Sequence, residues 1–287
     1  MPRPEHANWN GTEIPLSEVR VSVLDRAYMF GDGVYEVFRV YNGQMFLDRP
    51  HFDRLQDSLA QLRIVTDVAR LEQRVRDTLA HSGVQEGQVY LQVSRGEAPR
   101  SHPFPSPPVT PNELIFVREY DSDPYAASRA SGIRALLVPD VRWKRCDIKS
   151  LNLLGNVLAS QAASEAGCGE AIMATADGTI TEGSHSTVFG VRNGALVTAP
   201  LDSNILPGIT RKLVLELADA CGIRVEEQPF TVTSLNSLDE VFATSTIAEV
   251  LPVIGIEGHP WPARPPGPVT RQLQTAYRDY VGQSCGG

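Results

Sequence analysis

Three Asn-Gly or Asp-Gly pairs, each lying between two strand-like runs, constrain the fold of this chain more than any other feature. They are Asn42-Gly43, Asp177-Gly178 and Asn193-Gly194. Such pairs accept the positive φ angles of tight turns between antiparallel strands. The run GVYEVFRVY before the first turn is rich in the β-branched and aromatic residues that favour strands. Strands joined by hairpins, with helices interspersed, predict an α+β fold.

Helical and extended segments alternate along the rest of the chain. Phe52, Leu55 and Leu59 recur at helical spacing after Pro50, and Gly83 is placed to end a second helix. Helices are expected after Pro50, after Thr66-Asp67, after Lys149, after Pro207-Gly208 and near residues 268–282. Strands are expected at residues 88–94, 113–117, 133–138 and 240–246, and on both sides of the three turns.

A polar segment without periodicity, REYDSDPYAAS, covers residues 118–128 and contains a proline. Segments of this kind are typical of linkers, and a chain of 287 residues is long enough for two domains. We therefore expect a smaller N-terminal domain in residues 1–118, a linker in residues 119–128 and a larger C-terminal domain in residues 129–287.

The balance of charges argues against a nucleic-acid-binding protein. The chain has 26 Lys and Arg against 34 Asp and Glu, which gives a formal net charge of -8 and a pI of about 5.3. The N-terminal residues lack the apolar core of a signal peptide, and no apolar run approaches membrane-spanning length. The cysteines are scattered without metal-ligand spacing, so we expect no metal site and reduced thiols in a cytoplasmic protein. They are Cys146, Cys168, Cys221 and Cys285.

The segment RWKRCDIKSLNLL, residues 142–154, places Lys149 at the boundary of an apolar element. A lysine at such a boundary usually lays its stem on the surface and keeps its charge in water. The alternative is a lysine held in a dry site, where its amine forms a Schiff base with a carbonyl compound. The apolar residues that follow are spaced as on the buried face of a helix: Leu151, Leu153, Leu154, Val157 and Leu158.

Two further segments offer groups that bind anions. In LPGITRK, Ile209 and Thr210 follow a Pro-Gly pair at a helix start, where the first amides have no internal partner. Ser245 and Thr246, at the end of a strand, offer amides and hydroxyls in the same way. Each segment also fits a plain helix start or a solvated strand end.

Glu182 follows a strand and precedes a glycine in TITEGSHST. It either faces water in a turn or points inward, and an inward carboxylate needs a cationic partner or a proton. A protonated pyridine nitrogen would suit it, because an adjacent carboxylate favours the charged form of such a base by roughly 1–3 pKa units.

With these segments in view, the sequence resembles the fold-type IV pyridoxal-phosphate enzymes, the group of branched-chain and D-amino-acid aminotransferases. Within that group it is most similar to bacterial D-amino-acid transaminase, over nearly the whole chain. The matching stretches are DRAYMFGDGVYEVFRVYNG, HFDRL, SRGEAPRSHPFP, RWKRCDIKSLNLLGNVLA, TITEGSHSTVFG, LPGITR and ATSTIAEVLPV. The resemblance implies the two-domain α+β architecture of fold type IV, with the larger C-terminal domain binding the cofactor.

The resemblance also implies pyridoxal 5'-phosphate as cofactor and a role for individual residues. Lys149 matches the lysine that forms the Schiff base, and Glu182 matches the acid paired with the pyridine nitrogen. Further contacts to the cofactor phosphate and ring are implied at Arg54, Leu206, Ile209, Thr210, Ser245 and Thr246. A trap for the substrate α-carboxylate is implied at Tyr35, Arg100 and His102, with Arg100 and His102 contributed by the neighbouring subunit of a homodimer.

The chemistry of Arg100 and His102 also suits the binding of a carboxylate. Arg100 and His102 are two positions apart, so they project to the same side of an extended loop. The planar guanidinium suits bidentate carboxylate binding, and the prolines around it stiffen the segment. The alternative is a solvent-exposed surface loop in which Arg100 and His102 bind no ligand.

The implied activity is amino-group transfer between a D-amino acid such as D-alanine and a 2-oxo acid such as 2-oxoglutarate. A branched-chain L-aminotransferase shares the lysine, glutamate and phosphate segments but is not expected to carry the Arg-Ser-His element. An aminodeoxychorismate lyase would release pyruvate without an amino acceptor, and an (R)-selective amine transaminase would need no carboxylate trap. A non-catalytic phosphate-ligand binder would need neither Lys149 nor Glu182. The chain also departs from the serine run of its relatives at His185, which is expected to face outward.

Overall fold

The computed structural model describes residues 6–286, which divide into two compact units. Unit 1 extends to Asp123 and also includes Ile148–Asn152 and the chain from Ser284 onward. Unit 2 comprises Pro124–Asp147 and Leu153–Gln283. Each unit combines helices with a β-sheet, which confirms the predicted α+β class.

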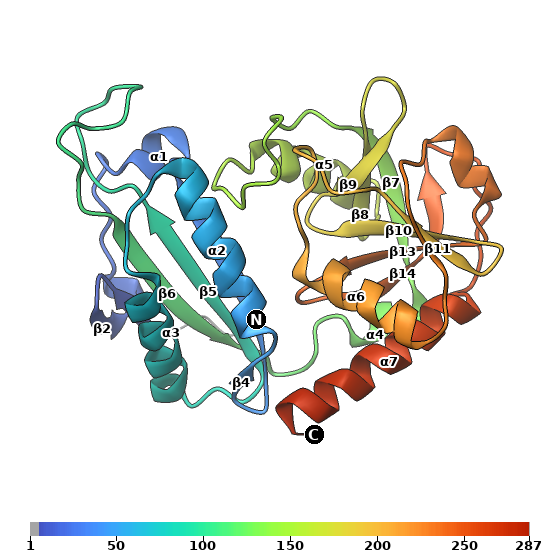
Figure 1. The fold of residues 1–287 in the computed structure, drawn as a ribbon, viewed down its shortest axis with the longest axis horizontal. Helices are drawn as coiled ribbons and strands as arrows, with labels where there is room; N and C mark the ends of the chain where they lie inside the picture. The colour runs from blue at the N-terminus through green and yellow to red at the C-terminus, as the bar shows by residue number, and fades with distance from the viewer. Residues whose placement is uncertain (1–5, 287) are drawn as a thin grey trace. The chain divides into compact units, whose positions relative to one another are not determined.

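Unit 1 contains a six-stranded sheet in the order β2-β1-β6-β5-β3-β4, in which all neighbours are antiparallel. Its strands are β1 (His6–Trp9), β2 (Thr12–Pro15), β3 (Gly33–Tyr41), β4 (Gln44–Met45), β5 (Gly87–Ser94) and β6 (Asn112–Glu119). The helices are η1 (Leu16–Glu18), α1 (Arg26–Phe30), α2 (Asp48–Leu62) and α3 (Val68–Ser82), and the last two lie on one face of the sheet (Figure 1). The predicted turn at Asn42-Gly43, with φ of 49° and 73°, joins β3 to β4.

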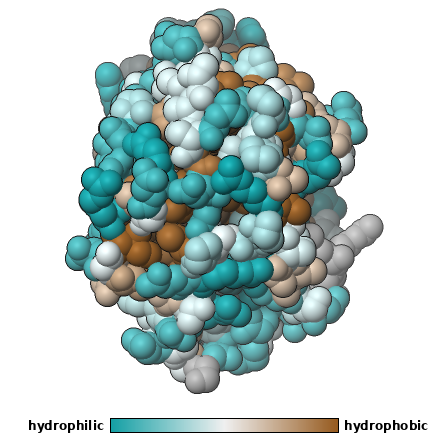
Figure 2. Space-filling view, turned by 90° about the vertical axis from the view of Figure 1, so that its right-hand side faces the viewer, coloured by the Kyte–Doolittle hydropathy of each residue, from teal (hydrophilic) through white to brown (hydrophobic). Residues whose placement is uncertain are grey.

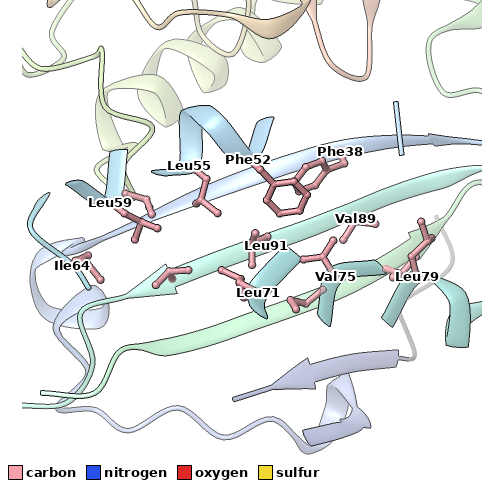
Figure 3. Packing of buried hydrophobic residues seen from close by; sticks show 14 of the residues in the cluster. Phe38, Phe52, Leu55, Leu59, Ile64, Leu71, Val75, Leu79, Val89 and Leu91 are labelled. Carbon is pink, nitrogen blue, oxygen red and sulfur yellow. The ribbon is translucent and has the colours of Figure 1, made fainter. Parts of the chain in front are cut away.

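The core of unit 1 lies between these two helices and the sheet. Figure 3 shows apolar side chains of α2 and α3 meeting those of β3 and β5. The labelled residues are Phe38, Phe52, Leu55, Leu59, Ile64, Leu71, Val75, Leu79, Val89 and Leu91.

The Asp67 side chain caps α3 by accepting a hydrogen bond from the Arg70 amide at 3.0 Å, and Gly83, with φ of 66°, ends the helix. The helical spacing and the capping residues therefore predict α2 and α3 correctly.

The segment around Lys149 belongs to unit 1 because its backbone is hydrogen-bonded to the start of β3. The Tyr35 N–H donates to the Lys149 carbonyl at 3.1 Å, and the Leu151 N–H donates to the Gly33 carbonyl at 3.0 Å. Val34 and Ser150 form an isolated bridge between these two bonds. Five residues thus extend the bonding of the six-stranded sheet, although the chain on both sides of them belongs to unit 2.

Unit 2 contains an eight-stranded mixed sheet in the order β12-β11-β10-β13-β14-β7-β8-β9. β7 runs parallel to β8 and β14, β11 runs parallel to β12, and the other pairs are antiparallel. The strands are β7 (Ile133–Pro139), β8 (Glu170–Ala174), β9 (Ile180–Gly183), β10 (Thr187–Arg192), β11 (Ala195–Thr198), β12 (Val225–Glu227), β13 (Glu240–Ser245) and β14 (Glu249–Glu257). The helices are α4 (Ala126–Ser131), α5 (Leu154–Glu165), α6 (Ile209–Ala220), η2 (Thr233–Ser237) and α7 (Pro268–Cys285).

The sequence predicts that the large apolar residues of α5 are buried, and this prediction is wrong. Leu154, Val157 and Leu158 are 72%, 56% and 57% exposed. The face that packs on β7 and β8 carries Ala159 and Ala163 instead. These small side chains let the helix approach the sheet closely, so the larger ones point away from it.

Most of the large exposed apolar side chains fall in two stretches of the sequence. They are Val21, Val23, Leu24 and Tyr28 in the first stretch, and Val141, Trp143, Leu154, Val157 and Leu158 in the second. On the face shown in Figure 2, apolar side chains lie in small groups among hydrophilic ones. Within residues 6–286, no helix combines the length and the apolar character needed to cross a lipid bilayer.

Candidate active site

Lys149 is half-buried and fixed through its backbone. Its N–H donates to Ser58 Oγ of α2 at 3.2 Å, and its carbonyl accepts the bond from Tyr35. Its Nζ lies 4.2 Å from the centre of the Tyr35 ring, within the range of a cation–π contact. The lysine therefore stands on an anchored segment beside an aromatic ring, which differs from the usual surface lysine.

Arg54 belongs to a buried group of three side chains, here named the Glu36 cluster (Glu36, His51 and Arg54). Arg54 Nε and Nη2 donate to the two oxygens of Glu36, both at 2.8 Å, and His51 Nδ1 lies 2.7 Å from Glu36 Oε2. Glu36 is 0% exposed. This bidentate geometry orients the guanidinium.

The charges of the Glu36 cluster balance within the protein. Burial would raise the pKa of Glu36, but the charge of Arg54 and the hydrogen bonds from Arg54 and His51 hold that pKa well below its ordinary value. Burial lowers the pKa of His51, against the pull of Glu36, so the imidazole is neutral near pH 7. One carboxylate therefore faces one guanidinium. The sequence pointed to Arg54 through HFDRL, but only the fold brings Glu36 of β3 to it.

Arg100 and His102 lie in an exposed loop of unit 1 and approach the same aromatic ring. The Arg100 Cζ is 5.3 Å from the centre of the Phe30 ring, and the His102 ring centre is 5.5 Å from it. The two side chains therefore lie on one side of the loop, as the sequence predicts. Tyr35, the third residue of the predicted trap, lies on β3 with its ring stacked 5.9 Å from that of Tyr90.

In unit 2, Glu182 points inward and its cationic partner within the protein is Arg142. The side chains of Asp140, Arg142 and Glu182, here named the Glu182 cluster, are 7%, 4% and 8% exposed. Arg142 Nη1 donates to Glu182 Oε1, and Nη2 donates to Asp140 Oδ2 at 2.7 Å. The Leu206 N–H donates to Glu182 Oε2 at 3.2 Å. The sequence placed Arg142 only in a cationic cluster, because its contact with Glu182 joins residues 40 positions apart.

Two carboxylates share one guanidinium in the Glu182 cluster, so it carries one uncompensated negative charge when both are ionised. Burial raises the pKa of Glu182 to about 7, against the opposing charge of Arg142. Burial would also raise the pKa of Asp140, but hydrogen bonds from Arg142 and Thr181 hold it below its ordinary value. A second cation beside Glu182 would therefore be stabilised, and it would in turn favour the ionised carboxylate.

The start of α6 and the end of β13 lie close together. Thr187 of β10 pairs with Thr244 of β13. A Cβ atom on Gly208 would approach Thr187 Oγ1 to 2.9 Å, so a glycine is needed for this contact. The structure thus brings the first amides of α6, at Ile209 and Thr210, next to the strand end that carries Ser245 and Thr246.

Several donors at this place suit an anion. Within the part of the chain that is described, no side chain caps the start of α6, and Thr244 Oγ1 is buried without a hydrogen-bond partner. Ser245 Oγ accepts from the Ala248 N–H at 3.2 Å, which leaves its own proton for another acceptor. A phosphate group, with several oxygens and a negative charge, fits helix amides and hydroxyls of this kind.

The turn after Glu182 is fixed by a buried carboxylate. Ser184 and Ser186 donate their hydroxyl protons to Glu170 of β8, which is 3% exposed. His185 Nδ1 lies 3.4 Å from Glu170 Oε2, but its side chain is half exposed. The prediction that His185 faces outward holds for about half of its surface, and Glu170 was not found from the sequence.

Comparison with known proteins gives consistent matches over nearly the whole chain. The family model described as amino-transferase class IV matches residues 33–256. The chain is 44% identical over 274 residues to the D-alanine aminotransferase of Staphylococcus haemolyticus, which covers 95% of this chain and 96% of that protein. The D-alanine aminotransferase of Bacillus licheniformis is 40% identical over 275 residues, with the same two coverages.

Solved structures give the same picture of the fold. The branched-chain amino acid aminotransferase of Escherichia coli matches with a TM-score of 0.90 at 27% identity, covering 96% of this chain and 94% of that one. The T.th. branched-chain amino acid aminotransferase, in its structure with pyridoxamine 5'-phosphate, matches with a TM-score of 0.89 at 26% identity, covering 98% and 95%.

Proposed function

The chain belongs to the class IV aminotransferase family, and from this premise we propose that it is a pyridoxal-phosphate-dependent D-amino-acid transaminase. Its substrates are a D-amino acid such as D-alanine and a 2-oxo acid such as 2-oxoglutarate. The structural observation that carries the proposal is the Glu182 cluster, a buried group with one negative charge left for a ligand cation. The D-amino-acid preference is supported by the 40–44% identity to D-alanine aminotransferases and by the Arg-Ser-His element.

The residues present fit this cofactor group by group. Within unit 2, a phosphate suits the amides of Ile209 and Thr210 and the hydroxyls at the end of β13, and Arg54 of unit 1 is proposed as its guanidinium. A protonated ring nitrogen suits Glu182. The side chain of Leu206 is proposed to pack on the ring, because the Leu206 N–H donates to the same carboxylate. When bound, pyridoxal phosphate supplies an electron sink for the pair released at the substrate Cα, which no side chain can offer.

The chain's own residues then have separate tasks. Lys149 Nζ would hold the cofactor covalently, and as a free amine it would accept the proton that leaves the substrate Cα. Glu182, oriented by Arg142, would hold a proton on the ring nitrogen, whose positive charge would in turn favour the ionised carboxylate. Tyr35, Arg100 and His102 bind the α-carboxylate and so orient the Cα–H bond for Lys149.

We further propose a cytoplasmic homodimer in which Arg100 and His102 serve the neighbouring subunit. Both residues are exposed in the single chain, as a contribution to another chain requires. The outward row Leu154, Val157 and Leu158 of α5 has helical spacing and gives an apolar surface that a second copy would cover. The cytoplasmic assignment is supported by four free cysteines, since secreted proteins usually pair theirs.

A coupled assay with racemic alanine and 2-oxoglutarate tests the proposed function. The D-enantiomer should disappear while glutamate forms in equal amount, and the L-enantiomer should remain. Consumption of L-alanine, or of L-leucine in a parallel assay, would instead favour the branched-chain activity of the structural relatives. Pyruvate formation from aminodeoxychorismate, without any amino acceptor, would favour a lyase.

A further inference from the structure

The loop that carries Arg100 and His102 is held from inside unit 1 by a buried cluster, here named the loop anchor (Arg26, Asp32 and Arg95). Arg26 and Arg95 are 3% and 6% exposed. Arg26 Nε donates to Asp32 Oδ2 at 2.7 Å, and Arg95 donates to both Asp32 oxygens at 2.8 and 2.9 Å. Two guanidinium groups therefore share one carboxylate and fix each other's orientation.

Arg26 directs its remaining donors at the backbone of the loop. Its Nη1 donates to the Ser101 carbonyl at 2.6 Å, and its Nη2 donates to the His102 carbonyl at 3.3 Å. Its Cζ also lies 4.8 Å from the centre of the Phe30 ring, the same ring that Arg100 and His102 approach. The backbone of the loop and its two functional side chains are thus positioned against α1.

Arg95 fixes the loop at a second point. Its Cζ lies 3.6 Å from the centre of the Phe104 ring, and its Nη atoms donate to the carbonyls of Leu62 and Arg63 at the end of α2, at 2.7 and 3.2 Å. The loop is rich in proline, which has no N–H, so it has few donors of its own for its carbonyls. The Arg26 guanidinium, from outside the loop, satisfies two carbonyls of this proline-rich segment, and Arg95 adds the contact with the Phe104 ring.

We propose that Arg26 is a positioning residue for recognition of the substrate carboxylate. It acts through Arg100 and His102, because its Nε, Nη1 and Nη2 atoms already donate to Asp32, Ser101 and His102 and its side chain is buried. The inference rests on the proposed function, in which these two residues bind the α-carboxylate. Arg26 and Asp32 therefore belong to the machinery for amino-acid specificity, although neither touches the substrate.

Arg26→Met should weaken D-alanine binding more than it slows turnover. Without the two carbonyl bonds the loop samples other positions, and Arg100 spends less time in the geometry that matches a carboxylate. Loss of a charge-assisted contact costs roughly tenfold to a hundredfold in binding. We expect KM for D-alanine to rise roughly tenfold or more, with a much smaller change in kcat at saturation. A merely structural role would lower the melting temperature and the active fraction but leave KM unchanged.

The test is a double-mutant cycle on the holoenzyme with Arg26→Met, Arg100→Ala and the double variant. If Arg26 acts through Arg100, Arg26→Met should raise KM in the wild-type background and add little in the Arg100→Ala background. Arg26→Lys keeps the charge beside Asp32 with fewer donors, and it should show a smaller rise in KM at a near-normal melting temperature. It replaces Arg26→Met in the cycle if that variant does not fold.

Arg74→Met is the matched control. Arg74 also pairs with a buried carboxylate of unit 1, Glu113, and donates to Asn8 at 2.6 Å. Its loss should lower stability without raising KM. Full additivity in the cycle, or an unchanged KM in both Arg26 variants while Arg100→Ala raises it, overturns the inference and leaves the proposed function intact. An unchanged KM in Arg100→Ala itself overturns both.

Discussion

The two buried carboxylate clusters of this chain use the same chemical groups with a different charge balance. In the Glu36 cluster one carboxylate meets one guanidinium and a neutral imidazole, so its charges cancel within unit 1. In the Glu182 cluster two carboxylates share the single guanidinium of Arg142, so unit 2 keeps one buried negative charge. A balanced cluster holds a side chain in place, whereas an unbalanced one is completed by a ligand of opposite charge.

This difference assigns distinct tasks to the two clusters. Glu36 and His51 position Arg54, whose guanidinium is proposed to meet the cofactor phosphate. Glu182 is itself the contact proposed for the ring nitrogen, and Arg142 prevents burial from raising its pKa further. The two clusters should therefore respond in opposite directions when the charge of the central carboxylate is removed.

The largest effect on folding stability is expected for Glu36→Gln, which leaves the charge of Arg54 buried without its partner. Breaking a buried ion pair in this way costs about 3–5 kcal/mol. Urea unfolding of the cofactor-free protein should show a loss of that order. Asp53→Asn, which removes the exposed partner of Arg49, is the control and should change stability by less than about 1 kcal/mol. Equal small losses in both variants would show that the Glu36 cluster does not support the fold.

Glu182→Gln should slow the chemical step about a hundredfold in the cofactor-bound enzyme. A neutral amide no longer favours a protonated ring nitrogen, and that support is worth roughly 1–3 pKa units. Stopped-flow absorption in a single turnover with D-alanine measures the rate of Cα deprotonation. A wild-type rate in this variant would mean that Glu182 is not the partner of the ring.

In the cofactor-free protein, Glu182→Gln should increase the free energy of unfolding. This effect is smaller than the loss expected for Glu36→Gln and has the opposite sign. Folding raises the pKa of Glu182 from about 4.5 to about 7, so the folded state retains a proton that the unfolded state has lost. The contribution of Glu182 to wild-type stability should therefore fall as pH rises from about 4.5 to about 7 and stay level above that. Glu182→Gln leaves the charges of Asp140 and Arg142 balanced, and it removes this dependence of stability on pH.

The difference in unfolding free energy between the wild type and Glu182→Gln measures the effect of the unbalanced charge directly. At pH 8, Glu182→Gln should be more stable than the wild type by about 3 kcal/mol, and below pH 4.5 the advantage should vanish. Thermal unfolding of both cofactor-free proteins across this pH range provides the data. A destabilised variant at pH 8 would mean that the cluster is already balanced and does not need a ligand cation.

The local parts of this structure could be predicted from the sequence. Helical spacing and capping residues predicted α2 and α3, and the Asn-Gly pair predicted the turn between β3 and β4. These features depend on neighbours within a few positions, which the sequence displays directly. The same spacing rule predicted the wrong buried face for α5, because it identifies a row of apolar residues but not the surface against which that row packs. In this chain Ala159 and Ala163 contact the sheet, and the leucines are left for another surface.

Single residues of the candidate site could be singled out from the sequence, whereas a charge shared by distant residues could not. Lys149, Glu182 and Arg54 were singled out by their segments, and the last two are buried, as an inward position requires. Glu36 was missed because its role depends on a contact with Arg54 across 18 positions. Asp140 was missed because it shares Arg142 with Glu182, and the contact between Arg142 and Glu182 spans 40 positions. Charge balance is a property of the folded cluster, so no single segment of the sequence reveals it.

Lys149→Ala separates the covalent task of the lysine from the binding of the cofactor. The variant should still bind pyridoxal phosphate through the start of α6 and the end of β13, with weaker affinity. Its transaminase activity should fall by several orders of magnitude, because Lys149 is the proposed acceptor of the Cα proton. Equilibrium dialysis with the cofactor checks the first expectation, and the D-alanine assay checks the second.

The most direct test of the proposed chemistry is to locate the covalent cofactor in the wild-type protein. The chain has three lysines, Lys144, Lys149 and Lys212, so the assignment is unambiguous. The enzyme incubated with pyridoxal phosphate is reduced with borohydride, digested and mapped by mass spectrometry. We predict a stoichiometric phosphopyridoxyl group on Lys149 and none on the other two. An adduct on Lys144 or Lys212, or no adduct in a protein that is otherwise folded, would contradict the role of Lys149.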